Sequence, residues 1–133
     1  MRDFDVQTIE VPVPIDVAFE YIADPLTLPA WTHAFQSVAD GRATLATPRG
    51  TVEVALEVRA ARESGTVDWL MTFPDGSVGR AYSRLVGRGS RTLYSFMLLA
   101  PPVPLEQLEG ALEEQAKVLA QELVALRERL SGL

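Results

Sequence analysis

The chain has 133 residues, of which 47% are hydrophobic and 23% charged, with a net charge of −6 and no cysteine. That length is typical of one domain, so we expect a single domain over residues 1–133. The absence of thiols excludes disulfides, thiolate catalysis and sulfur-ligated zinc, and the acidic balance argues against a nucleic-acid partner. No stretch approaches the roughly 20 apolar residues of a membrane span. Residues 1–5 show no signal-peptide pattern, so we expect a cytoplasmic protein without membrane insertion.

The first part of the chain is predicted to form a strand followed by two short helices. Apolar and polar residues alternate over 4–11, which indicates the strand. A helix over about 14–23 follows and is ended by Pro25. A second short helix is expected over about 25–31, limited by Pro29 near its end.

The middle of the chain is predicted to form about six antiparallel strands. Glycine-rich turn signals separate apolar runs at regular intervals, as in a series of hairpins. The clearest runs cover residues 51–62 and 66–73, the run over 78–86 is less clear, and both faces of the run over 91–99 are fairly apolar. In the run over 78–86 we place the arginines on the outer face, which puts Tyr82 outside as well.

This middle region is also locally basic. Residues 41–100 contain eight arginines and five acidic residues. Because opposite charges on neighbouring strands stabilise a sheet, we expect these arginines on its solvent face beside glutamates. An anionic partner is the alternative interpretation.

A long amphipathic helix is expected over 104–130. Its apolar stripe consists of Leu105, Leu108, Leu112, Leu119, Leu123, Leu126 and Leu130, with Ala116 filling the gap. Such a helix would be about 40 Å long, enough to cross a whole sheet. The stripe is broader than a coiled-coil seam, which favours packing on a sheet over a coiled-coil partner. The formation of a homodimer is a further possibility that the sequence does not decide.

Three segments near the N-terminus share their order with a known family: the strand ending at Pro14, the helix that stops at Asp24-Pro25, and Leu28-Pro29-Ala30-Trp31. This order resembles the START-like superfamily, also called SRPBCC or Bet v 1-like, in its polyketide cyclase/dehydrase branch. The resemblance implies an α+β helix-grip fold, in which an antiparallel sheet of about six or seven strands wraps around a long C-terminal helix. It also implies two short helices after strand one, and a deep apolar cavity for a small hydrophobic ligand, with no cofactor.

Large side chains expected on the helix-facing side of the sheet are candidate ligand-binding residues. They are Trp31, Phe35, Trp69, Met71, Phe73, Tyr94 and Phe96, with Gln115 as a polar group from the last helix. For Tyr94 and Phe96 this depends on which face of the run over 91–99 points inward. Plain core packing is the alternative for each residue, because aromatic side chains also fill cores that bind nothing.

Candidates for catalysis are few. His33 is the one histidine in the chain, and an imidazole titrates near neutral pH, which suits proton transfer. No carboxylate neighbours it in sequence, which favours a solvated side chain, and one histidine is at best half of a metal site, so no metal is predicted. Tyr82 and Tyr94 are weaker candidates, since a phenol can stabilise an enolate.

The preferred function is therefore binding of a small hydrophobic or amphipathic molecule, which could be polyketide-, aromatic- or lipid-like, as in lipid transport. The alternative is a cofactor-free cyclase or dehydratase that uses His33 or a tyrosine for proton transfer. A protein-binding domain, which occurs on the same fold, is a third possibility.

Overall fold

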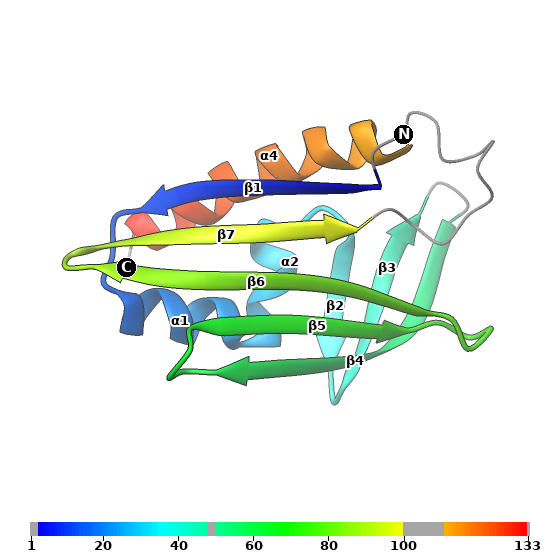
Figure 1. Ribbon diagram of the computed structural model, residues 1–133. Helices are drawn as coiled ribbons and strands as arrows, with labels where there is room; N and C mark the ends of the chain where they lie inside the picture. The colour runs from blue at the N-terminus through cyan, green and yellow to red at the C-terminus, as the bar shows by residue number, and fades with distance from the viewer. Residues whose placement is uncertain (1–2, 48–49, 100–110, 133) are drawn as a thin grey trace.

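A computed structural model describes residues 3–47, 50–99 and 111–132. Seven strands form one antiparallel sheet in the order β1-β7-β6-β5-β4-β3-β2 (Figure 1). The strands are β1 Phe4–Val11, β2 Phe35–Ala39, β3 Arg42–Thr47, β4 Gly50–Ala61, β5 Thr66–Thr72, β6 Val78–Arg88 and β7 Arg91–Leu99. Together with a C-terminal helix, α4 (Ala111–Ser131), this confirms the predicted α+β helix-grip architecture.

The segment between β1 and β2 is helical, as predicted, but its second part is divided. It contains α1 (Ile15–Ala23), a 3₁₀ turn η1 (Pro25–Thr27) and α2 (Leu28–Trp31). The Asp24 carboxylate caps η1 by accepting a hydrogen bond of 3.0 Å from the Leu26 amide. Pro29 lies in the first turn of α2, not near the end of a longer helix, because a proline there loses no needed donor.

Helix α4 lies along β1 (Figure 1). The Gln7 side-chain amide of β1 donates a 2.8 Å hydrogen bond to the Ala116 carbonyl of α4. Four leucines of the predicted stripe are buried: Leu119, Leu123, Leu126 and Leu130. The predicted helical residues 104–110 lie outside the described residues, as do Leu105, Leu108 and the side chain of Leu112. No helix in the described ranges is long and apolar enough to cross a membrane.

Alternating side chains divide the sheet into a buried inner face and an outer face. On β6, Ser83 and Leu85 are buried and Arg84 is exposed, so Tyr82 lies on the outer face, as predicted. On β7, Tyr94 is buried and pairs with Leu85. The expected ion pairs of the basic region are present among exposed side chains, and include Arg42 with Glu53 at 2.7 Å, Arg91 with Glu10 at 2.9 Å, and Arg59 with Glu57.

Two contacts fix the ends of these strands. The buried Thr92 hydroxyl donates a 2.8 Å hydrogen bond to the Val13 carbonyl, which attaches the start of the helical segment to β7. Gly65, in the turn before β5, has a φ of +70° and accepts a 2.7 Å hydrogen bond from the Leu85 amide. A side chain at Gly65 would collide with the Leu85 carbonyl, so this turn and β6 approach as closely as glycine allows.

Candidate ligand-binding site

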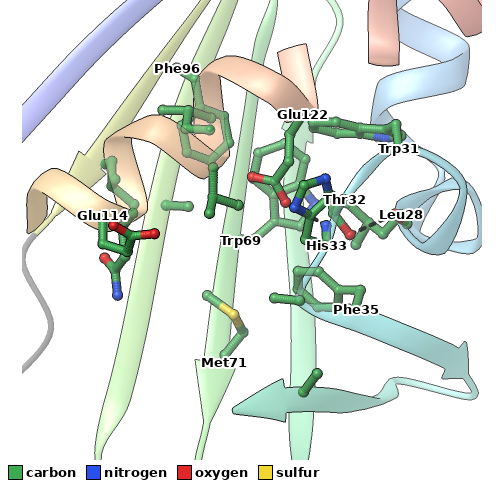
Figure 2. A pocket seen from close by; sticks show the side chains of 17 residues that line it. Leu28, Trp31, Thr32, His33, Phe35, Trp69, Met71, Phe96, Glu114 and Glu122 are labelled. Carbon is green, nitrogen blue, oxygen red and sulfur yellow. Dashed lines mark hydrogen bonds between the residues drawn. The ribbon is translucent and has the colours of Figure 1, made fainter. Parts of the chain in front are cut away.

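A cavity of about 500 Å³, partly open to solvent, lies between the inner face of the sheet and α4. Figure 2 shows the side chains around it, which come from α2 and the turn after it, from five strands and from α4. Its apolar lining residues are Leu28, Trp31, Ala34, Phe35, Ala46, Trp69, Met71, Ala81, Phe96, Leu98, Val118 and Leu119. Its polar lining residues are Thr32, His33, Glu114, Gln115 and Glu122.

The sheet side of the cavity combines large rings with a small residue. Trp69 and Phe96 stack with their ring centroids 5.8 Å apart and their planes inclined by 27°. Ala81 pairs with Trp69 on one side and with Leu98 on the other. Because Ala81 has only a methyl group between these larger neighbours, the sheet leaves space at this point that a larger residue would fill.

The helix side of the cavity is one face of α4. Gln115, Val118, Leu119 and Glu122 follow the spacing i, i+3, i+4 and i+7, which brings them to one side of a helix. Polar groups therefore approach the cavity from α4, whereas the strands that line it contribute apolar side chains.

The structure places six of the eight predicted ligand-binding residues in the lining: Trp31, Phe35, Trp69, Met71, Phe96 and Gln115. Phe73 lies in the turn after β5, where its amide donates a 2.9 Å hydrogen bond to the Ser77 carbonyl, and it is not part of the lining. Tyr94 is buried beside Phe96, with the ring centroids 6.5 Å apart, and is also outside the lining. Ligand contact by any of the eight residues stays a prediction.

Glu122 is one of three polar lining residues that the sequence analysis missed, the others being Thr32 and Glu114. Its carboxylate accepts a 2.6 Å hydrogen bond from the backbone amide of His33 (Figure 2). Burial raises the pKa of the Glu122 carboxyl, and the amide and positive charge of His33 oppose this rise. Helical spacing could have indicated that Glu122 faces the cavity, because it lies three residues after Leu119 of the apolar stripe. Nothing in the sequence pairs Glu122 with His33.

The three weak catalytic candidates have different surroundings. The His33 side chain is exposed, and the described bond to Glu122 uses its backbone amide. Tyr82 lies on the outer face of the sheet, away from the cavity. Burial raises the pKa of the Tyr94 phenol well above its usual range, and the charges of Asp68 and Glu122 add to the rise.

The Tyr94 hydroxyl has no hydrogen-bond partner within the described residues. The nearby Ser83 hydroxyl donates its proton to the Val67 carbonyl, at 2.6 Å. Tyr94 is therefore a buried neutral phenol rather than a group poised to exchange protons with a ligand.

The charged groups of the described lining are mostly acidic. Glu114 and Glu122 come from α4 and His33 from the turn after α2, while lysine and arginine are absent from this lining. No cluster of three or more histidine, aspartate or glutamate side chains that could hold a metal ion occurs in the described part of the chain.

Comparison with known proteins connects this geometry to a fold class. No family profile matches the chain, and no curated protein matches it by sequence. A START superfamily protein from Mycobacterium smegmatis superposes with a TM-score of 0.66 at 15% identity, over 98% of this chain and 99% of that one. The Zhui aromatase/cyclase from Streptomyces sp. R1128 gives 0.64 at 14% identity, over 97% and 91%.

A third similar structure contains two domains. The di-domain ARO/CYC BexL from the BE-7585A biosynthetic pathway gives a TM-score of 0.69 at 13% identity, over 98% of this chain and 47% of that one. The protein thus has the START-like fold, and its structural neighbours include aromatase/cyclases of the kind that the sequence resemblance indicated.

Proposed function

We propose that this protein binds a small hydrophobic or amphipathic molecule in the cavity between the sheet and α4. The observation that carries this proposal is the cavity of about 500 Å³ with a largely apolar lining that includes Trp31, Trp69 and Phe96. Each Å² of apolar ligand surface removed from water there would contribute about 25 cal/mol. A ligand of aromatic, polyketide-like or lipid-like character fits this lining.

A cofactor-free cyclase or dehydratase is the second candidate. It is favoured by the likeness to aromatase/cyclases and by the hydrogen bond between the His33 amide and the Glu122 carboxylate at the cavity wall. Proton transfer would require the imidazole or the carboxyl to reach a ligand atom, whereas the imidazole is exposed. Binding therefore remains the preferred function.

Two measurements test the proposal. Native mass spectrometry of the purified protein, repeated after denaturation and organic extraction, should reveal a co-purified small molecule. Titration with the neutral fluorophore N-phenyl-1-naphthylamine should give saturable binding with a stoichiometry of one.

A matched pair of variants assigns that binding to the cavity. Ala81→Leu fills the space beside Trp69 and should weaken binding by roughly tenfold or more, because a ligand would have to displace the new side chain. Ala120→Leu adds the same atoms at an exposed position of α4 outside the lining and should bind normally. Equal binding by both variants, or no binding by the native protein, would contradict the proposed function.

A further inference from the structure

Glu122 has unused hydrogen-bonding capacity at the cavity wall. A carboxylate has two oxygens that together accept about four hydrogen bonds. In the described part of the chain, one oxygen, Oε2, accepts from the His33 amide at 2.6 Å. No described lysine or arginine lies within ion-pair distance of this carboxyl. A ligand group that donates a hydrogen bond could therefore gain a partner here.

Glu114 adds a second carboxylate to the same wall. It precedes Val118 by one helical turn and Glu122 by two, so both acids belong to the face of α4 that lines the cavity. His33, at the exposed turn opposite, is the one described lining residue that can carry a positive charge. The whole chain is acidic as well, with a net charge of −6.

These charges act differently on ligands of different charge. An anionic group in the cavity would lose its hydration, find no lysine or arginine in the described lining and be repelled by two carboxylates. A hydroxyl or amine would instead donate a charge-assisted hydrogen bond to the Glu122 carboxylate. The same apolar body should thus bind with an affinity that depends on the charge of its polar end.

We propose that the cavity selects neutral or cationic ligands that present a hydroxyl or amine to Glu122, and rejects amphiphiles ending in a carboxylate, sulfonate or phosphate. This selectivity rests on the proposed binding function and specifies its ligand class. Free fatty acids and anionic lipids are excluded by it, whereas aromatic alcohols, phenols and amines are favoured.

A pair of fluorophores with the same anilinonaphthalene body tests the selectivity. N-phenyl-1-naphthylamine is neutral, whereas 1-anilinonaphthalene-8-sulfonate carries a negative charge. At about pH 8, the neutral probe should bind at least tenfold tighter to the native protein. A second series, in which naphthalene carries an ethanol, ethylamine or acetic acid chain, separates charge from size by displacement of the neutral probe, and the acid should bind most weakly.

Variants of two glutamates on α4 connect the selectivity to its source. Glu122→Gln removes the charge and keeps the shape, so the preference for the neutral over the anionic probe should fall at least threefold. Glu128→Gln removes an exposed charge of the same helix outside the lining and should leave the preference unchanged.

The outcomes separate this inference from the function on which it rests. Equal affinity for both probes, or a preference that Glu122→Gln leaves unchanged, would overturn the selectivity while leaving ligand binding in place. Failure of every probe to bind would contradict the proposed function and the selectivity together.

Discussion

Glu122 of α4 and His33 of the turn after α2, 89 residues apart in the chain, are joined by a hydrogen bond of 2.6 Å at the wall of the cavity. The bond connects the helix that covers the sheet to the short helical segment at one end of it (Figure 2). It uses the backbone amide of His33 and no atom of the imidazole ring.

Glu122→Gln should stabilise the protein at about pH 8. Burial raises the pKa of this carboxyl above its ordinary value of 4.5, so folding disfavours the ionised form, whereas an amide avoids that penalty and still accepts from His33. The penalty is absent well below pH 4.5, grows as the pH rises from 4.5 towards the raised pKa of the folded state, and is complete above that pKa. Urea denaturation at about pH 8 and pH 4 should show a gain that shrinks at the lower pH.

Glu128→Gln is the control for this measurement, because Glu128 is exposed on the same helix. Its stability should follow that of the native protein at both pH values. A gain for Glu122→Gln that is equally large at low pH would show that charge is not its cause.

His33→Ala should bind N-phenyl-1-naphthylamine within about twofold of the native affinity. The substitution keeps the backbone amide that Glu122 accepts from and removes an exposed ring, so little of the apolar lining changes. Fluorescence titration measures this directly. A loss of tenfold or more, about 1.4 kcal/mol, would assign the imidazole to ligand contact and would favour the enzymatic alternative.

Tyr94→Phe should stabilise the protein by about 1 kcal/mol and leave ligand affinity unchanged, because it removes a buried hydroxyl that has no described partner and lies outside the lining. Tyr82→Phe, on the outer face, is the matched control and should be close to neutral. Chemical denaturation and probe titration of both variants provide the comparison. If Tyr94→Phe weakened binding, the phenol would have to contact the ligand after all.

Gly65→Ala should be far more destabilising than Gly89→Ala. Both glycines have similar positive φ angles, +70° and +67°. Alanine at Gly89 meets nothing within 4 Å, so it should lose roughly 1–2 kcal/mol from backbone strain alone. Alanine at Gly65 would also collide with the Leu85 carbonyl and should lose at least about 2 kcal/mol more, measured as the free energy of unfolding in urea. Equal losses would contradict the close approach of this turn to β6.

Local patterns were sufficient to predict most of the fold. Alternation over 78–86 placed Tyr82 outside, and the leucine stripe placed the described part of α4 on the sheet, because burial of one face follows the period of each element. The split between η1 and α2 was not predicted, since it depends on the Asp24 cap and on Pro29 acting at the start of a helical turn.

The site was less predictable, because it depends on contacts between distant segments. Aromatic type and parity indicated Trp69 and Phe96, but parity could not show that Tyr94, on the same face of β7, lies outside the lining. The sequence analysis placed Phe73 in a strand over 66–73, whereas β5 ends at Thr72. The direction of the Phe73 side chain could therefore not be deduced from alternation. The partnership of Glu122 with His33 requires the helix and the turn to be placed in space first.

The sheet order also has a consequence for how the chain is made. Strands β2 to β7 each pair with a neighbour in sequence, whereas β1 pairs with β7, Phe4 lying opposite Leu99. During synthesis the hairpins can form one after another, but β1 must wait for β7, and α4, which packs along β1, is made after all seven strands. The inner face therefore lacks its helical cover until α4 has been made, and a ligand can be enclosed only after that point.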